Sequence, residues 1–192
     1  FHAACKGGHV DVVRELLALE GDNAVNAEVC VRSVFNTVCS HGFVAVFKEL
    51  LSLAGRRVSH GAFSTSEAFG HACFSGRLVI ARELLALEGE WRVDVHCGNE
   101  EAFAFACGSG NVDLVRLLLS LEGDRRVDVH AQHLDALSDA CQSGNVDVLR
   151  ELLSLTGGRK LQLRAGHVFA ACRLGSVSLL RELLAHEGGD EL

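Results

Sequence analysis

The sequence predicts an all-α solenoid of six stacked helix-turn-helix units joined by short extended links. One observation is a six-residue motif, typified by Ala-Cys-Gly-Ser-Gly-Asn, that occupies residues 4–9, 38–43, 72–77, 106–111, 140–145 and 171–176. Another is the spacing of the motif cysteines, which are separated by 34, 34, 34, 34 and finally 31 residues. A leucine pair and a glycine follow every motif with the same steps. Self-similarity at a period of ~20–50 residues is typical of repeat proteins, in which each unit packs only on its neighbours.

Each unit is expected to begin with a short helix, as the fifth unit shows. Asp135 suits the N-cap of a first helix over 136–142, because its carboxylate can accept from the free backbone N–H groups there. Gly144 then ends this helix, because glycine adopts the left-handed conformation of a helix C-terminus without strain. The positions that match Asp135 in other units are held by Ser33, Glu67 and Glu101.

A second helix and an extended link complete each unit. In the fifth unit the second helix is expected over 146–155, with a buried stripe formed by Val146, Leu149, Leu152 and Leu153. The Val-Asp-Val alternation at 127–129, repeated at 93–95 and echoed at 161–163, predicts a brief extended segment in the link. The second helices share a basic row, which we expect to form ion pairs between units with the neighbouring glutamates: Arg14, Lys48, Arg82, Arg116, Arg150 and Arg181.

Composition and charge narrow the class of protein. Hydrophobic residues make up 48% of the 192 residues, which suits a packed core and argues against disorder. The net charge of −7 disfavours a nucleic-acid-binding surface, and no apolar run approaches the ~18–20 residues of a membrane-spanning helix. We therefore expect no nucleic-acid partner and no membrane insertion. Because the chain begins at Phe1 inside a motif and contains no methionine, we expect a fragment of a longer protein, and membership of a larger complex stays open.

The eight cysteines are expected to be free thiols. Six of them occupy one position per unit, and packed helices lie ~8–10 Å apart, whereas a disulfide needs Cα atoms within about 7 Å. No Cys-x-x-Cys pair is present to bind zinc. We expect the six motif cysteines to be buried and to pack like alanine, with Cys30 and Cys97 in connecting segments. Free thiols favour a reducing intracellular compartment.

The first unit resembles a known family. Residues 1–17 follow the Leu-His-x-Ala-Ala-x-x-Gly-His…Val-Val…Leu-Leu pattern of ankyrin repeats, and residues 24–27 resemble the Val-Asn-Ala finger of that family. The match continues in register over essentially all 192 residues. This resemblance implies a single array of stacked helix pairs with finger loops, and it implies protein binding. The expected units are approximately 1–30, 31–64, 65–98, 99–132, 133–163 and 164–192.

The departures from the family pattern concern mainly the fingers. Ankyrin units usually have 33 residues and begin with Thr-Pro-Leu-His, whereas this chain has a 34-residue period and no proline. We expect the helix pairs to stack as in the family and the finger loops to be blunted or irregular. Tetratricopeptide repeats share the 34-residue period, but their tryptophan, tyrosine and proline positions are absent here, which disfavours that alternative.

The resemblance also implies where a partner would bind. In ankyrin repeats the binding residues lie on the inner helices before the inter-helix glycine and on the fingers. Phe74 is a bulky ring at an otherwise polar inner-helix position, so it is either a binding anchor or packs on a neighbouring unit. Phe43 poses the same question, whereas Phe105 is expected in the core. The predicted partner-binding residues are Phe74, Ser75, Phe43, His41, Ser109, Gln142, Arg173 and Leu174 on the inner helices, and His96, Asn99, Glu100, His130 and His133 on the fingers.

No pattern of catalytic or metal-binding residues stands out. The glycines punctuate turns at the repeat period without forming a nucleotide-binding fingerprint, and the finger histidines lack metal-ligand spacing. We therefore expect no enzyme activity, no metal and no cofactor. The leading hypothesis is a scaffold that binds an unidentified protein through its concave inner-helix and finger surface. Two alternatives are a structural spacer or bridging subunit in a large assembly, and the regulatory region of a larger enzyme.

Overall fold

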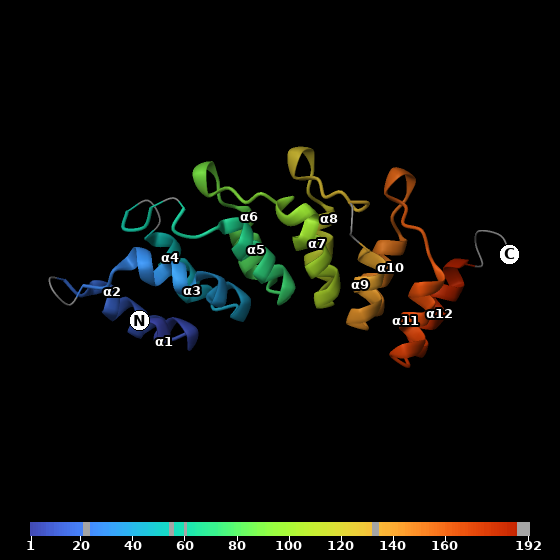
Figure 1. Ribbon diagram of the computed structural model, residues 1–192, viewed down its shortest axis with the longest axis horizontal. Helices are drawn as coiled ribbons and strands as arrows, with labels where there is room; N and C mark the ends of the chain where they lie inside the picture. The colour runs from blue at the N-terminus through green and yellow to red at the C-terminus, as the bar shows by residue number, and fades with distance from the viewer. Residues whose placement is uncertain (21–23, 54–55, 60, 132–134, 188–192) are drawn as a thin grey trace. The chain divides into compact units, whose positions relative to one another are not determined.

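A computed structural model describes residues 1–20, 24–53, 56–59, 61–131 and 135–187 (Figure 1). Within these ranges the chain is all-α, as the sequence predicts, and short 3₁₀ helices begin several links. The α-helices are α1 (His2–Lys6), α2 (Val10–Ala18), α3 (Ala27–His41), α4 (Val44–Ser52), α5 (Thr65–Phe74), α6 (Leu78–Leu85), α7 (Cys97–Ser109), α8 (Val112–Leu119), α9 (Ala136–Ser143), α10 (Val146–Leu153), α11 (Ala165–Arg173) and α12 (Val177–Glu187). The 3₁₀ helices are η2 (Gly89–Trp91), η3 (Gly123–Arg125) and η4 (Gly157–Arg159).

The helices form two compact units. Unit 1 is Phe1–Asp94 and unit 2 is Val95–Leu192, and each contains three pairs of an inner and an outer helix. In unit 1 the inner helices α1, α3 and α5 pack side by side in that order, and so do the outer helices α2, α4 and α6. In unit 2 the inner helices α7, α9 and α11 pack in the same way, as do α8, α10 and α12.

The core of each unit comes from the repeated motif. Phe35, Phe69 and Phe103 occupy the same position in three inner helices and are at most 1% exposed. A fully buried aliphatic or aromatic side chain of this size stabilises the fold by ~1.5–3 kcal/mol. The expected stripe of α10 is corrected in two places, because Val148, Leu149 and Leu152 are buried whereas Val146 and Leu153 are only half-buried. The stripe is therefore shifted around the helix by about half a turn at its start.

The links contribute to the core through their valines. Val127 and Val129 are each 3% exposed and Asp128 between them is exposed, so the alternation predicts the segment correctly. A 3₁₀ turn precedes this segment, and Gly123 begins it with a φ of 63°. The left-handed conformation suits glycine, which explains why a glycine recurs at this position in the links. The irregular fingers expected from the sequence thus begin with a tight turn.

The helix starts agree with the sequence only in part. Asp135 caps α9 by accepting from Ser138 N at 3.0 Å, as predicted. The prediction that Ser33, Glu67 and Glu101 stand at the N-caps of the corresponding helices is wrong. The capping side chains are Asn26, which accepts from Val29 N at 3.2 Å, and Ser64, which accepts from Glu67 N at 3.1 Å. Inner helices α3 and α5 therefore begin earlier than the repeat spacing predicts, by up to two turns.

The cysteines and the outer row follow the prediction at most positions, but the placement of Cys30 and Cys97 in connecting segments is wrong, because Cys30 lies inside α3 and Cys97 begins α7. All eight thiols are free, and five of the six motif cysteines are buried. Cys172 is the exception, because α11 packs against an inner helix on one side only among the described residues. The ion pairs expected between outer helices are present: Arg14–Glu49 at 2.6 Å, Lys48–Glu83 at 2.8 Å, Arg116–Glu151 at 2.8 Å and Arg150–Glu182 at 2.9 Å.

Candidate functional site

The turns between inner and outer helices form the first candidate surface. We call residues 6–9, 40–43 and 74–77 the turn face of unit 1, and residues 108–111, 142–145 and 173–176 the turn face of unit 2. Neighbouring turns interlock. The ring of Phe43 would lie 2.7 Å from a Cβ atom on Gly8, and Arg77 would lie 3.0 Å from one on Gly42. Because both glycines also have positive φ, any other residue there is strained, and the turns are held rigidly.

The turn face of unit 1 carries an exposed aromatic side chain. Phe74 is 64% exposed, so the structure places most of its ring in solvent. Phe43 is half-buried against Gly8, and His41 stacks on it with ring centroids 5.5 Å apart. His41 also donates from Nδ1 to Thr37 O at 2.8 Å, which fixes its ring. Ser75 is half-buried beside Phe74. The unit therefore presents one protruding ring next to a stacked His–Phe pair.

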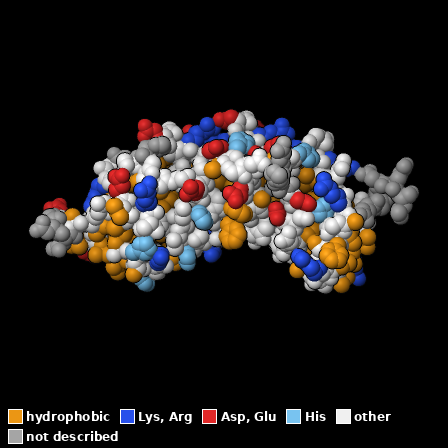
Figure 2. All heavy atoms as spheres, in the orientation of Figure 1, with side chains coloured by type: hydrophobic (Ala, Val, Ile, Leu, Met, Phe, Trp, Pro, Cys, Tyr) orange, Lys and Arg blue, Asp and Glu red, His pale blue; other side chains and the backbone are white. Residues whose placement is uncertain are grey.

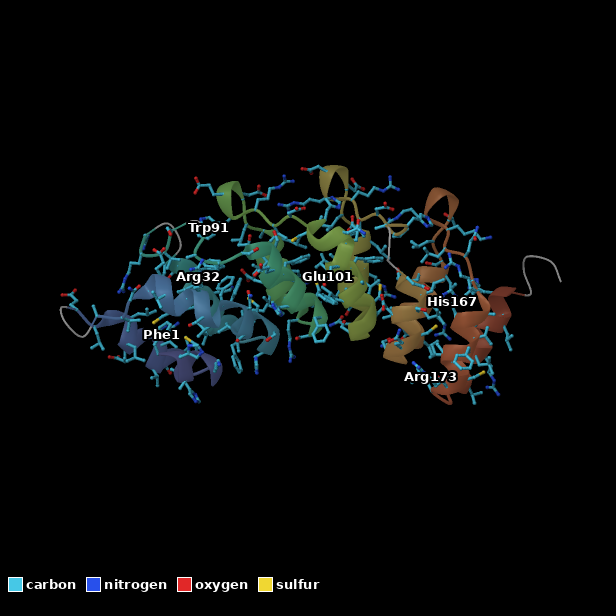
Figure 3. The ribbon with its side chains drawn as sticks, viewed as in Figure 1. Phe1, Arg32, Trp91, Glu101, His167 and Arg173 are labelled. Carbon is cyan, nitrogen blue, oxygen red and sulfur yellow. The ribbon has the colours of Figure 1, made fainter. Side chains whose placement is uncertain are left out.

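The turn face of unit 2 is closed by its own hydrogen bonds. Ser109 donates to Ala106 O at 2.8 Å and accepts from Asn111 N at 3.2 Å, so its hydroxyl serves the turn. Asn145 accepts from Asp147 N at 2.9 Å and donates to Gly110 O at 2.7 Å. The remaining predicted residues here, Gln142, Arg173 and Leu174, are exposed, with Arg173 at the lower edge of Figure 3.

Arg77 also belongs to the turn face of unit 1, but it was not among the binding residues predicted from the sequence. Arg77 follows the inter-helix glycine, is exposed, and donates from Nε to Ser40 O at 2.9 Å. With Lys6, His9 and His41 it makes this face basic. The column after the glycine reads His9, Phe43 and Arg77 in unit 1, and Asn111, Asn145 and Ser176 in unit 2. Comparing that column between repeats is the signal that could have found it.

On the link side, Glu100 is a structural residue. It is 4% exposed, its Oε1 accepts from Asp128 N at 3.2 Å, and His96 Nδ1 lies 2.5 Å from the same oxygen. His96 also donates from Nε2 to Asp124 O at 2.8 Å. The prediction that Glu100 faces a partner is corrected, because the side chain is turned inward to hold the next link. His96 is partly exposed but is fixed by the same cluster.

The residues around this cluster adopt an unusual backbone. Gly98, Asn99 and Glu100 have φ values of 67°, 60° and 68°, so three successive residues are left-handed. Non-glycine residues pay roughly 1–2 kcal/mol each for this conformation, which the contacts of Glu100 must offset. Asn99 is exposed at the surface of this turn. His130, the repeat equivalent of His96, is exposed and donates from Nε2 to Gly158 O at 3.0 Å, whereas His133 lies outside the described residues.

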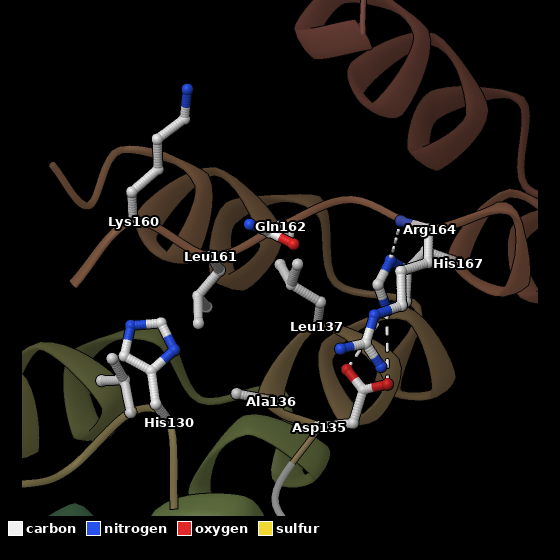
Figure 4. Close-up of a pocket in the computed structure, with 10 residues that line it drawn as sticks. His130, Asp135, Ala136, Leu137, Lys160, Leu161, Gln162, Arg164 and His167 are labelled. Carbon is white, nitrogen blue, oxygen red and sulfur yellow. Dashed lines mark hydrogen bonds and ion pairs between the residues drawn. The ribbon is translucent and has the colours of Figure 1, made fainter. Parts of the chain in front are cut away.

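A hollow of about 340 Å³ lies between the links and inner helices of unit 2 (Figure 4). His167, 2% exposed, accepts at Nδ1 from Arg164 N at 3.0 Å and therefore donates from Nε2 to Asp135 at 3.2 Å. Burial opposes ionisation of Asp135, but its hydrogen bond from Ser138 N and the neighbouring His167 outweigh this and lower its pKa. Asp135 and His167, which form part of this wall, are thus bonded to each other and to the backbone, which makes this pair structural.

Metal binding and membrane insertion have no support among the described residues. Among them, no group of three or more His, Cys, Asp or Glu side chains is arranged to hold a metal ion. None of the described helices is both long and apolar enough to cross a membrane.

Two family models match the chain. The model "Ankyrin repeats (3 copies)" matches residues 69–165, and the model "Ankyrin repeat" matches residues 1–29. The chain belongs to the ankyrin repeat family. No curated protein matches it. Ankyrin repeats are in general protein-binding modules and typically non-enzymatic scaffolds, so the family accounts for the stacked helix pairs and directs attention to a protein partner.

Proposed function

We propose that this ankyrin repeat chain binds a partner protein through the turn face of unit 1, with Phe74 as the anchor. The observation that carries the proposal is the 64% exposure of Phe74. The equivalent positions hold Lys6, Ser40, Gly108, Gln142 and Arg173, so the fold itself does not require an aromatic ring there. Large aromatic side chains dominate the energetics of protein interfaces when they enter a pocket on the partner.

The interlocked turns support this proposal. Phe43 on Gly8 and Arg77 on Gly42 hold the turns in one arrangement before any partner arrives. A rigid surface loses little conformational entropy on binding, so more of the contact energy appears as affinity. The link side is a weaker choice, because Glu100, His96 and His130 are engaged in holding neighbouring links.

The test compares two exposed apolar residues of unit 1. Phe74→Ala and Val79→Ala each remove an exposed side chain, 64% and 54% exposed, and Val79 lies on the outer helix α6. Partners of the full chain are captured by mild crosslinking from its native source, identified, and their affinity measured with each variant. We expect Phe74→Ala to weaken binding by about 2 kcal/mol and Val79→Ala to leave it unchanged. Equal binding by both variants would contradict the proposal.

A bridging role is the second candidate, and one observation favours it. The last two described helices expose four large apolar side chains: Phe169 at 68%, Val177 at 58%, Leu184 at 51% and Leu174 at 47%. Exposed apolar surface of this kind suits an interface with another subunit. Crosslinks confined to α11 and α12, with no effect of Phe74→Ala, would favour the bridging role.

A further inference from the structure

Positive charge collects at one end of the inner helices of unit 1. Lys6 and His41 lie in the last turns of α1 and α3, and Arg77 is the N-cap residue of α6, three residues after the end of α5. The acids of these helices, Glu28 and Glu67, lie in the first turns of α3 and α5. Figure 2 shows His and some Lys or Arg side chains at the lower edge of unit 1, and further Lys and Arg side chains among the Asp and Glu side chains higher up. The acids of α3 and α5 therefore lie at the opposite helix ends from Lys6, His41 and Arg77.

Distance and pairing keep this charge from being neutralised within the unit. Thirteen residues separate Glu28 from His41, which at ~1.5 Å per residue is about 20 Å, or twice the screening length at physiological salt. Glu28 also accepts from Ser59 Oγ at 2.8 Å. Neither Lys6 nor Arg77 forms an ion pair with a carboxylate of the described residues, in contrast to Lys48 on the outer face, which pairs with Glu83.

Favourable interaction with the helix dipole does not explain the pattern. Cations near a helix C-terminus are stabilising, so Lys6 and His41 could serve their own helices. The matching helices of unit 2 test this. Neither α7 nor α9 has a basic residue in its last turn, yet both form and end at a left-handed glycine, Gly110 or Gly144. The helix ends of this fold therefore do not need a cation.

We propose that the turn face of unit 1 docks an acidic segment of the partner protein, with one apolar or aromatic side chain of that segment packed on Phe74. This inference rests on the proposed function and names its partner class. Charge complementarity across an interface selects partners and speeds their encounter, while a central aromatic contact supplies most of the affinity. Lys6 and Arg77 supply the cations of this face: Arg77 lies three residues after Phe74, and Lys6 is in the last turn of α1.

An acidic protein segment fits better than a nucleic acid. Nucleic-acid binding requires many Lys and Arg side chains to neutralise successive phosphates, and this face offers two, Lys6 and Arg77. A short protein segment with a few carboxylates around an apolar residue needs only a few cations to bind, and Lys6 and Arg77 supply them.

The experiment selects short random peptides displayed on phage against the full chain, in parallel with two variants. Lys6→Gln/Arg77→Gln removes the cations of the turn face, and Arg32→Gln removes a charge from α3 far from the turn (Figure 3). We expect peptides rich in Asp and Glu around an apolar residue, with affinity about tenfold weaker for the double variant and unchanged for Arg32→Gln. Binding should also weaken as salt is raised.

Several outcomes would overturn the inference. Enrichment of neutral or basic peptides, no enrichment, or equal losses with Arg32→Gln would each contradict it. Tighter binding of a single-stranded oligonucleotide than of any selected peptide would assign the face to nucleic acid. If the crosslinked partner depends on Phe74 but not on Lys6, Arg77 or salt, the proposed function stands and the acidic partner is wrong. If the partner is indifferent to Phe74, the proposed function itself is wrong.

Discussion

The two units build the same turns from different side chains. In unit 2 the turn residues form hydrogen bonds within the fold. Ser109 donates to Ala106 O, and Asn145 caps α10 and donates to Gly110 O. In unit 1 the equivalent places hold His41 and Phe43, which stack on each other. Nearby, Phe74 is 64% exposed, and Arg77 is exposed and donates to Ser40 O. The scaffold tolerates both solutions because left-handed glycines recur in the turns of both units.

The link sides of the two units also use different kinds of side chain. Unit 2 holds its links with a buried polar cluster around Glu100, whereas unit 1 uses aromatic stacking. Phe63 lies between Phe35 and Trp91, with ring centroids 3.9 Å and 5.0 Å away, and Trp91 is at the link edge in Figure 3. The two units therefore hold their links with different kinds of side chain.

The largest expected effect comes from a substitution in the polar cluster of Glu100, His96 and Asp128 that holds the links of unit 2. Glu100→Ala removes the acceptor of Asp128 N and the partner of His96, and we expect it to destabilise unit 2 by about 2 kcal/mol. The equivalent bond in unit 1, from Asp94 N to Ser66 Oγ at 2.9 Å, is neutral, so Ser66→Ala should cost about 1 kcal/mol. Hydrogen exchange of the Asp128 and Asp94 amides measures each effect locally.

A second substitution at Glu100 distinguishes the loss of its side-chain contacts from the relief of its backbone strain. Glu100→Gly loses the same side chain but relieves the left-handed φ of 68°, so it should be about 1 kcal/mol less damaging than Glu100→Ala. If the two variants unfold alike, the left-handed backbone carries no strain. If Ser66→Ala is as damaging as Glu100→Ala, the difference between the link sides is not energetic.

The sequence predicted what depends on the repeat and missed what depends on single residues. The cysteine and leucine spacing placed the helices, and the Arg–Glu row predicted the outer ion pairs, because each repeats in register. Glu100 looked like a finger residue since periodicity cannot reveal three successive left-handed residues. Phe74 could be singled out as an odd side chain in its column, but its 64% exposure is known only from the structure.

A smaller effect concerns Asp139, a half-buried carboxyl group on the inner helix α9. Burial, with a contribution from Asp135, raises its pKa to about 6, whereas the unfolded chain has about 3.8. A raised carboxyl pKa adds stability while the group is protonated, and this stability is lost as the pH rises from about 4 to 6. Because the carboxyl group is partly solvated, we expect Asp139→Asn to stabilise unit 2 at pH 7 by about 1 kcal/mol and to do nothing at pH 3.

Urea unfolding at both pH values measures this difference, and Asp113→Asn is the matched control. Asp113 is an exposed carboxylate of α8 that pairs with Arg116 at 3.5 Å. We expect its loss to change stability little at either pH. Stabilisation by Asp113→Asn equal to that by Asp139→Asn would mean that reduced net charge, not burial of Asp139, is responsible.

The smallest effect is kinetic and reports on both units at once. Burial raises the pKa of Cys5 and Cys141 to about 11 and raises those of Cys39 and Cys73 as well, so these thiols should react with iodoacetamide only when the structure opens. Cys30, Cys97 and Cys172 should react first, since they are half-buried or exposed. Mass spectrometry of the labelled chain follows each site. In Glu100→Ala we expect Cys107 and Cys141 to react faster while Cys39 keeps its rate, because the lost contacts lie within unit 2. Equal acceleration of Cys39 would mean that the two units open together, and the contrast between their link sides would then have no separate energetic consequence.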